Sequence, residues 1–485
     1  MKILMVVSEL SPYVKTGGLA DMVSSLSREL VRNGNDVRAL IPFYGSIEER
    51  WRRNMRPLAS PLCVHMGQER WARVHETIER CGLHVYFLEH HHYFDRERPY
   101  DSCYGAYGDN GERFAFLCRA AIDLPSLIDW IPDVFHCHDW MASLVPVYLE
   151  TVVRHGPLGN SASVLTVHNL EHQGYGDKSI VQMAGLPQWT FRPDGLEACG
   201  AVNFLKGGIY FANKLTTVSP SYGEEIKTAE GGFGLDGALR FRGGDIIGIL
   251  NGIDCEVWDP ATDSALAANY SSKNISAKST CKSALQKMCH LDERQSAPLF
   301  GVISRLHWQK GLDTLCDAME WILAHMDIQF ALLGAGQWQL EERFRLLANR
   351  HSGKMFAAIG YDEELAHRIE AGCDFFIMPS RFEPCGLNQL YSLRYGTLPI
   401  VRATGGLRDT VQNYGNCEDC GTGFVFNDLT ADAIRGTIRW ACDTYHRAPA
   451  HMAAMIRRAM ESDFSWSRSA IRYCECYRWA LQSKS

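Results

Sequence analysis

Hydrophobic residues fall into short continuous runs that alternate with amphipathic segments along the chain. In the first half these runs cover residues 3–8, 37–41, 83–88, 134–137, 164–167 and 215–218. A second series covers residues 246–250, 299–304, 330–333, 356–359, 375–378 and 398–401. Continuous apolar strands separated by helices are typical of parallel sheets that are covered on both faces. The pattern therefore predicts an α/β chain with two doubly wound, Rossmann-like domains.

The glycine-rich stretch GGDIIGILNGID, near residue 245, separates the two series. We therefore expect an N-terminal Rossmann-like domain over residues 1–245 and a C-terminal one over residues 246–460. In the final segment, 461–485, residues 463–480 are rich in Trp, Tyr and Arg and predict a helix. Because this segment follows every strand of the second domain, we expect its helix to cross back onto the first domain.

Two strand-to-helix turns carry nearly the same sequence, VKTGGLADMV at 14–23 and ATGGLRDTV at 403–411. Paired glycines let backbone N–H groups approach a ligand, and the dipole of the following helix adds positive potential. Ligands of open α/β sheets bind at the carboxyl ends of the strands. We therefore expect both loops to face one ligand site in a cleft shared by the two domains. A tight turn without a ligand is the alternative for either loop.

Cationic side chains occur beside two of the predicted turns. Lys15 directly precedes the first glycine pair, and Arg305 and Lys310 lie in SRLHWQKGLDTL, just before an amphipathic helix. An arginine fork and a lysine point charge at a helix start suit a diphosphate. Ordinary solvated surface cations are the alternative.

A carboxylate follows another buried strand, in PSRFEPCGLNQLY. Glu383 at this position could orient sugar hydroxyls, while the backbone amides of Leu387 and Asn388 stay available for phosphate. The alternative is a carboxylate that serves only the helix dipole.

Histidines and an aspartate mark two strand ends of the first half, in FHCHDW and LTVHNLEHQGY. Asp139 and His168 lie at the carboxyl ends, and His136 and His138 share one strand face. With HHH at 90–92 they suggest a metal, but no acidic partner spacing supports one and core histidines are common. We therefore predict no metal and no cofactor. The chain also lacks a P-loop and a G-x-G-x-x-G after the first strand, which disfavours a hydride-transferring Rossmann enzyme.

Composition limits the partners and the compartment. The net charge of −7 argues against nucleic acid or an anionic membrane as the main partner. No apolar run approaches the ~20 residues of a membrane-spanning helix. The seventeen cysteines are odd in number and scattered, which is typical of reduced thiols and indicates a cytoplasmic protein. We interpret C-x2-C at 417–420 and C-x-C at 474–476 as a surface turn and part of a helix, rather than as a zinc site.

A series of motifs, in order over nearly the whole chain, resembles the bacterial and plastid glycogen and starch synthases. They are KTGGLAD (15–21), CHDW (137–140), TVHN (166–169), LNGID (250–254), SRLHWQKG (304–311), GY (360–361), SRFEPCGLNQLY (380–391) and TGGLRDTV (404–411). The resemblance implies the GT-B fold, two Rossmann-like domains with a cleft between them, and a retaining glucosyltransferase that uses ADP-glucose.

The resemblance also implies roles for single positions. Lys15, the backbone of Gly17 and Gly18, Arg305 and Lys310 would hold the phosphates of ADP.

On the sugar side, His168 would lie beside the transferred glucose and Glu383 would bind its hydroxyls. Cys385 and Gly386 would shape the same loop, and Tyr361 would stack on adenine.

The remaining implied positions surround these. Asp139 and Asn251 would line the site, Asp21 would lie near the acceptor, and Thr404 would lie on the donor side. The sequence departs from the family at Asn388, where the motif has threonine; a phosphate contact through the backbone would survive this change.

The expected reaction is transfer of glucose from ADP-glucose to the non-reducing end of an α-1,4-glucan such as glycogen, with retention of configuration. The alternatives are a UDP-glucose-dependent or small-acceptor GT-B glucosyltransferase, and a non-catalytic glucan- or nucleotide-binding homologue. The presence of Lys15, His168, Arg305, Lys310 and Glu383 favours an enzyme.

Overall fold

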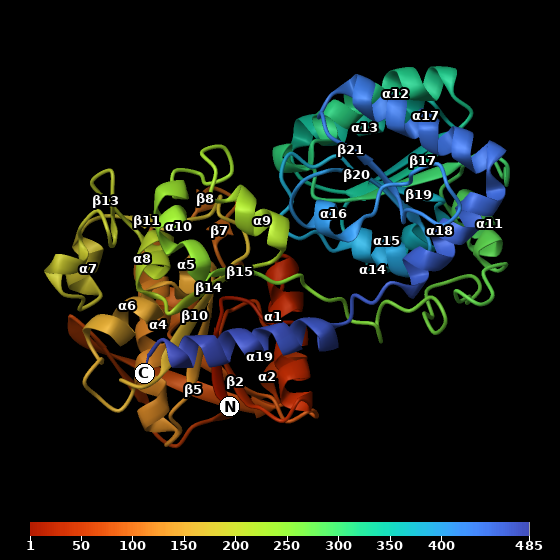
Figure 1. Ribbon diagram of the computed structural model, residues 1–485. Helices are drawn as coiled ribbons and strands as arrows, with labels where there is room; N and C mark the ends of the chain where they lie inside the picture. Colours follow the sequence, from red (N-terminus) through yellow and green to blue (C-terminus); the bar gives the residue numbers. More distant parts are fainter. Residues whose placement is uncertain (485) are drawn as a thin grey trace. The chain divides into compact units, whose positions relative to one another are not determined.

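The computed structural model describes residues 1–484, and the chain divides into two compact units (Figure 1). The first contains Met1–Gly252 together with the residues from Trp466 onward, and the second contains Ile253–Ser465. The division thus falls at Gly252 rather than near residue 245. The prediction that residues 246–250 open the second series of strands is wrong, because β15 (Ile246–Gly248) pairs in parallel with β14 (Lys214–Thr217) at the edge of the first sheet.

A ten-stranded sheet forms the centre of the first unit, in the order β15-β14-β10-β9-β1-β2-β6-β5-β3, with β4 paired to β5. All pairs from β15 to β6 are parallel. The strand order reverses between β1 and β9, which makes their carboxyl ends the topological switch point. The other strands of this sheet are β1 (Lys2–Val6), β2 (Asp36–Pro42), β3 (Arg56–Pro57), β4 (Leu62–Met66), β5 (Gln68–Ile78), β6 (His84–Glu89), β9 (Val134–His138) and β10 (Ala162–Val167).

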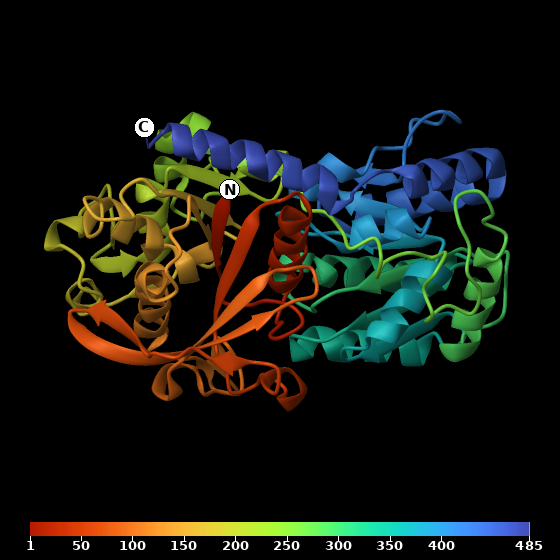
Figure 2. The same cartoon turned by 90° about the horizontal axis from the view of Figure 1, so that it is seen from below.

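Helices cover both faces of this sheet. On one face α19 (Trp466–Gln482) packs against α1 (Gly18–Arg32), β9 and β10, and Figure 2 shows it lying along the first unit. On the other face lie α4 (Asn110–Leu127), α5 (Asp139–Ala142) and α6 (Leu144–Thr151). No helix among residues 1–484 is both long enough and apolar enough to cross a membrane.

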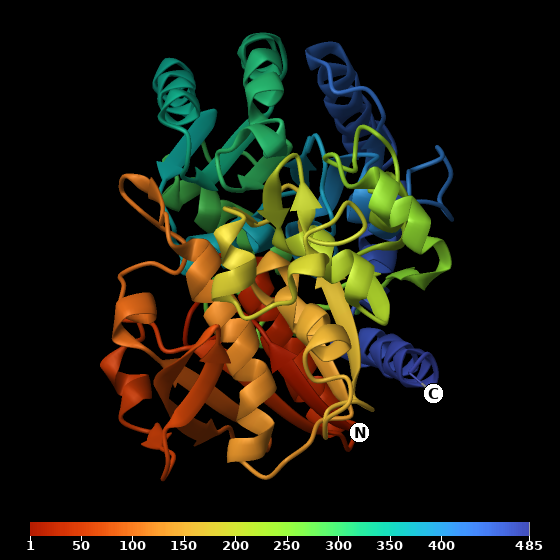
Figure 3. The same ribbon diagram turned by 90° about the vertical axis from the view of Figure 1, so that its left-hand side faces the viewer.

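Smaller elements complete the first unit. A three-stranded antiparallel sheet, β11 (Tyr175–Gly176), β13 (Ala201–Asn203) and β12 (Glu197–Ala198), lies on the side that faces the viewer in Figure 3. The others are α2 (Glu49–Arg52), α3 (His91–Phe94), β7 (Asp101–Ser102), β8 (Gly105–Ala106), α7 (Ser179–Met183), α8 (Phe204–Phe211), α9 (Pro220–Glu225) and α10 (Asp236–Arg242).

The second unit is built on a six-stranded sheet in the order β18-β17-β16-β19-β20-β21, with every pair parallel. When the six strands are numbered by their place in the chain, their order in the sheet is 3-2-1-4-5-6, the doubly wound arrangement. Its switch point lies between β16 and β19. The strands are β16 (Leu299–Ile303), β17 (Gln329–Gly334), β18 (Met355–Ile359), β19 (Phe375–Met378), β20 (Leu398–Arg402) and β21 (Phe424–Phe426).

Alternate strand residues of this sheet face two separate apolar cores. Phe300 and Phe330 pack with α12 (Leu312–His325), α13 (Trp338–Arg350), α15 (Asn388–Arg394), α17 (Ala431–Arg447) and α18 (Pro449–Glu461). Leu299 and Ala331 pack with α11 (Lys278–Met288) and α14 (Glu363–Gly372). Burial on both faces explains why these strands are continuously apolar in sequence.

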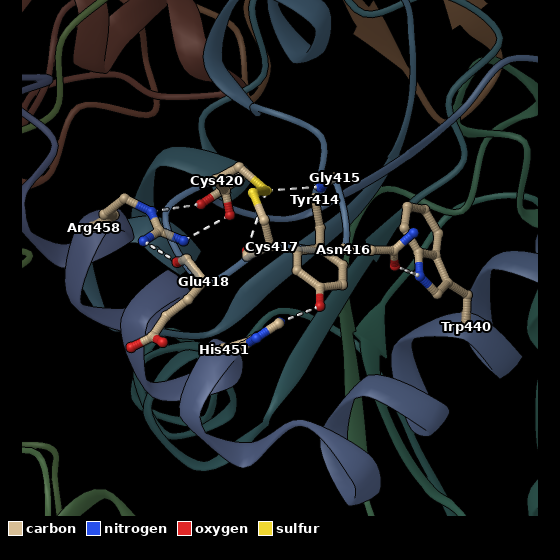
Figure 4. Close-up of a disulfide and its surroundings, with 10 residues drawn as sticks. Tyr414, Gly415, Asn416, Cys417, Glu418, Cys420, Trp440, His451 and Arg458 are labelled. Atoms are coloured by element: carbon tan, nitrogen blue, oxygen red, sulfur yellow. Dashed lines mark hydrogen bonds between the residues drawn. A yellow bond between two sulfur atoms is a disulfide. The ribbon is translucent and has the colours of Figure 1, made fainter.

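The loop between α16 (Gly405–Thr410) and β21 carries a disulfide between Cys417 and Cys420 (Figure 4). The guanidinium of Arg458 on α18 donates to the carbonyls of Glu418, Cys420 and Gly421, which fixes the loop. The pair is therefore a surface turn, as expected, but its cysteines are bonded to each other, unlike the reduced thiols expected throughout the chain.

Candidate active site

In the first unit, the candidate site residues lie at the carboxyl ends of β1, β9 and β10. Lys15 follows β1, and its ammonium Nζ lies 2.8 Å from the carboxylate Oδ2 of Asp21, on the first turn of α1. Both side chains are partly exposed, with 42% and 32% of their surface accessible. This pair places a solvent-accessible cation directly beside the glycine turn at the switch point of the first sheet.

Glu9, which sequence reasoning missed, lies beneath this turn. Its buried carboxylate accepts from the backbone N–H groups of Thr16 at 2.5 Å and Gly17 at 3.3 Å, and from the hydroxyl of Tyr100 at 2.5 Å. Gly17 has an extended backbone, with φ of −160°, and no atom lies within 4 Å of the position that a Cβ would take. The Gly17 N–H therefore already donates to Glu9, while the space on the Cβ side of Gly17 is open. A phosphate contact at this turn stays a prediction. A glutamate directly after an apolar strand was the available sequence signal.

His168 and Asp139 are joined at the ends of neighbouring strands. The backbone N–H of His168 donates to Oδ1 of Asp139 at 2.7 Å, and the ring nitrogen Nε2 of His168 lies 3.1 Å from Nδ1 of His138. Asp139 has a left-handed backbone, with φ of 56°, which this hydrogen bond supports. Burial raises the pKa of Asp139 to about 7, although backbone N–H groups oppose this shift, and burial lowers the pKa of His168 to about 3.

Asn251 lies near the end of the first unit and is buried. Its side-chain oxygen Oδ1 is inaccessible and has no hydrogen-bond partner among residues 1–484. A buried amide oxygen without a partner is costly, so this atom needs an explanation, and a bound ligand that donates to it would supply one.

In the second unit, the candidate site residues lie at the switch point between β16 and β19. The Nζ of Lys310 lies 2.6 Å from Oε2 of Glu383, and the hydroxyl of Ser380 donates to the same oxygen at 2.9 Å. The Glu383 side chain is only 6% exposed, and the Lys310 side chain is 19% exposed. Arg305 is exposed, and within residues 1–484 its guanidinium forms no ion pair. The second unit therefore combines a buried, paired carboxylate with an accessible cation at its switch point.

The second glycine pair supports the loop that carries Glu383. A Cβ on Gly405 would lie 2.0 Å from the carbonyl oxygen of Glu383, and one on Gly406 would lie 2.1 Å from that of Cys385. The Gly406 N–H donates to the Glu383 carbonyl at 3.0 Å. Thr404, at the start of α16, and Cys385 are both buried. These glycines are thus required by close backbone packing rather than by an open approach for a ligand.

The remaining predicted positions surround this loop. Gly386 has a φ of 72°, and Leu387 precedes the first turn of α15. The side-chain amide of Asn388 donates to the Ile303 carbonyl at the end of β16 at 2.5 Å, so this side chain links the two loops of the switch point. Tyr361 follows the edge strand β18 and is 80% exposed.

Among residues 1–484, three potential metal ligands come together only at Cys63, His65 and Glu69. They lie on the β4–β5 hairpin, where His65 and Glu69 are exposed. None of the predicted site residues belongs to this group.

Two sequence families match the chain. The profile described as "Starch synthase catalytic domain" matches residues 2–241, and the profile "Glycosyl transferases group 1" matches residues 289–460. "Glycogen synthase 1" of Geobacter sulfurreducens is 47% identical over 100% of this chain and 97% of its own length. "Glycogen synthase" of Treponema denticola is 42% identical over 100% of this chain and 99% of its own length.

Solved structures agree in fold. The catalytic domain of Starch Synthase IV from Arabidopsis thaliana, bound to ADP and acarbose, matches with a TM-score of 0.90 and 33% identity over 99% of both chains. Sucrose-phosphate synthase from Thermosynechococcus elongatus matches with a TM-score of 0.59 at 16% identity, which supports the fold alone.

Two doubly wound units whose charged loops lie at the switch points define a glycosyltransferase of the GT-B fold, which confirms the predicted fold class. The full-length identities are more specific than the fold. The chain belongs to the family of glycogen and starch synthases, as its motifs predict.

Proposed function

We propose that the chain transfers glucose from ADP-glucose to the non-reducing end of an α-1,4-glucan, with retention of configuration. The observation that carries this proposal is the Lys310–Glu383 pair at the switch point of the second sheet, where exposed Arg305 follows β16. The whole chain matches glycogen synthases along their length. The related starch synthase domain was solved bound to ADP, which supports an adenine nucleotide donor here.

Charge development in the transition state explains the cations. Breaking the bond between glucose C1 and the diphosphate builds negative charge on the leaving group. Arg305 and Lys310, with the amides at the start of α15, are proposed to stabilise that charge in fixed positions. Lys15 and the open turn at Gly17 and Gly18 would bind the same diphosphate from the first unit.

The sugar requires hydrogen-bonding groups of a different kind. Glu383, paired with Lys310, would accept from glucose hydroxyls, and His168 would contact the sugar from the first unit. Tyr361 is proposed to stack on adenine. Asp139 and Asn251 would line the site, Asp21 would lie near the acceptor, and Thr404 would lie on the donor side. Retention requires the acceptor 4-hydroxyl to attack on the face from which the diphosphate leaves, so the leaving phosphate can accept its proton.

The residues proposed to bind the donor come from both units, so in this proposal turnover requires both units to contact one donor molecule. Closure on the donor would exclude water and prevent hydrolysis of ADP-glucose. A cytoplasmic location is also part of the proposal. Fifteen of the seventeen cysteines form no disulfide, which is typical of reducing compartments.

The test is incorporation of labelled glucose from ADP-glucose into glycogen, run in parallel with UDP- and GDP-glucose and with a small sugar acceptor. We expect incorporation from ADP-glucose only when glycogen is present. Glu383→Gln removes the negative charge but keeps the shape, and should abolish most turnover while ADP still binds. Preference for another donor would overturn the proposed substrate, and absence of turnover with every donor would favour a binding protein.

A further inference from the structure

Three buried histidines form a row in the first unit. His136 and His138 occupy alternate positions of β9 and so lie on one face of the sheet, with ring centroids 4.1 Å apart. The His138 and His168 ring centroids are 5.3 Å apart. His136 and His138 are completely buried, whereas His168 is half-buried. The row therefore leads from the core of the unit to the predicted sugar site.

His136 anchors the inner end of this row. The hydroxyl of Tyr477, on α19, lies 2.9 Å from its Nδ1, and the hydroxyl of Thr166 lies 2.6 Å from its Nε2. Thr166 in turn lies 2.5 Å from the hydroxyl of Thr216 on β14. Both ring nitrogens of His136 therefore have partners, and its ring cannot move toward His138 without breaking them.

His138 differs from His136 because only one of its ring nitrogens has a partner. Its Nδ1 lies 3.1 Å from Nε2 of His168, while its own Nε2 is buried without a hydrogen-bond partner among residues 1–484. Burial lowers the pKa of both His138 and His168, so each ring is neutral near pH 7 and carries one N–H. One of these two protons must therefore lie between Nδ1 of His138 and Nε2 of His168.

We propose that His138 is a positioning residue that donates its Nδ1–H to Nε2 of His168, and so fixes the ring of His168 with its own proton on Nδ1. The reverse arrangement would leave the Nε2–H of His138 as a buried donor without an acceptor, which proteins rarely tolerate. The proposed arrangement leaves only a bare ring nitrogen in that place. The partner of one imidazole nitrogen sets which nitrogen carries the proton, and here that partner is another histidine.

The consequence concerns the sugar. His168 would present an N–H donor, rather than a lone pair, on the side of its ring that faces away from His138. Its backbone is fixed independently by the hydrogen bond to Asp139. This inference rests on the proposed function in one respect only, namely that the outer side of His168 contacts the transferred glucose.

The decisive measurement is the tautomer of His168, read from the ring ¹⁵N shifts of protein labelled in histidine. The chain has 18 histidines, so the signal is assigned by its loss in His168→Asn. We expect a protonated Nδ1 and a bare Nε2 in the wild type. A protonated Nε2 on His168 would overturn the proposal, even if every His138 variant failed to fold.

Substitutions at His138 provide the second arm. His138→Asn places an amide donor near the position of Nδ1 and should keep both the His168 tautomer and most of kcat. His138→Leu removes the donor, so the proton of His168 should no longer be confined to Nδ1. We expect kcat to fall by about 10- to 100-fold, as for other partners that orient a functional histidine. An unchanged tautomer in His138→Leu would also overturn the proposal.

The exposed His155, in the same unit, supplies the matched control, since His155→Leu should change neither readout. The tautomer is measured without turnover. A protein that shows the expected tautomer but transfers no glucose would refute the proposed function and leave this inference standing.

Discussion

The two TGGL turns share a sequence but differ in what surrounds their glycines. At Gly17 the space that a side chain would fill is empty, and the carboxylate of Glu9 holds the turn from below. At Gly405 and Gly406 the same space is occupied by the backbone of residues 383–385. The space beside the glycine is therefore open in one unit and filled by packed backbone in the other.

This difference shows that a repeated motif can keep its local geometry while its role changes. Each turn follows a parallel strand and begins a helix, as the pattern predicts. At the second turn the backbone of the loop that carries Glu383 packs on the glycines, where the loops after the adjacent strands β19 and β20 meet at one sheet edge. The following predictions test this contrast, beginning with the largest effect.

Gly406→Ala should be far more damaging than Gly17→Ala. Its Cβ would meet backbone atoms of Cys385 at 2.1 to 2.6 Å, and backbone cannot rotate away as a side chain can. We expect a loss of about 3 kcal/mol in the free energy of unfolding, at the upper end for overpacking. Turnover should also be lost, because the loop that carries Glu383 must shift. Denaturant unfolding and the glucose-transfer assay measure both, and wild-type stability in this variant would contradict the packing role.

Lys310→Ala should reduce kcat by about 10²–10³-fold, as when one donor to a developing anion is removed. Its loss also leaves the buried carboxylate of Glu383 without its ion-pair partner, which should lower the free energy of unfolding by about 2 kcal/mol.

Arg305→Ala removes an exposed cation and should lower kcat comparably without affecting stability. Steady-state kinetics and thermal unfolding separate the two variants. Equal loss of stability in both would show that Arg305 is not accessible.

Gly17→Ala should affect binding but not folding. The position is open and its φ suits any residue, so the free energy of unfolding should stay equal or rise by about 0.5 kcal/mol. A methyl group on the open side should hinder approach of the diphosphate and raise KM for ADP-glucose by about 10-fold, the equivalent of one charge-assisted hydrogen bond. Unchanged KM would mean that this turn holds no phosphate.

Stability should respond to pH with opposite sign in the two units. The pKa values of His136 and His168 are lowered by burial from 6.5 to about 3. The unfolded chain therefore gains protons that the folded unit cannot, and the first unit loses stability as pH falls from 6.5 toward 3. Asp139, whose pKa is raised to about 7, opposes this loss in part.

In the second unit the buried Glu370 has a pKa raised from 4.5 to about 8, so its contribution to stability is lost as pH rises between these values. Between pH 6.5 and 4.5, acidification should weaken the first unit and strengthen the second. Hydrogen exchange followed separately in each unit measures this. Glu370→Gln should flatten the response of the second unit only, and parallel responses of both units would contradict the assignment.

Much of the fold could be predicted from sequence because buried parallel strands are continuously apolar. The strands at 3–6, 37–41 and 134–137 were found in this way. β4 and β5 were missed because buried apolar residues there are interrupted by more exposed ones at the edge of the sheet. The strand at 246–248 was found and assigned to the wrong sheet, since pairing partners are not encoded locally.

The candidate site likewise has features that the sequence predicts and features that it does not. Lys15, Arg305 and Glu383 could be placed at strand ends from sequence, because helix starts and strand ends have local signals. The salt bridge between Lys310 and Glu383 joins residues 73 positions apart, and the contact of His138 with His168 joins two separate strands. The place of Glu9 after an apolar strand marks it as a candidate, but its hydrogen bonds to the amides of Thr16 and Gly17 depend on the fold of the turn.

The sequence by itself determined the succession of buried strands and helices and the charged residues that follow the strands, because periodicity and turn chemistry act over a few residues. Only the tertiary structure decided which strands are neighbours, which carboxylates are paired and which of two identical glycine turns is open. Those properties depend on contacts between segments far apart in the chain, and no local pattern specifies them.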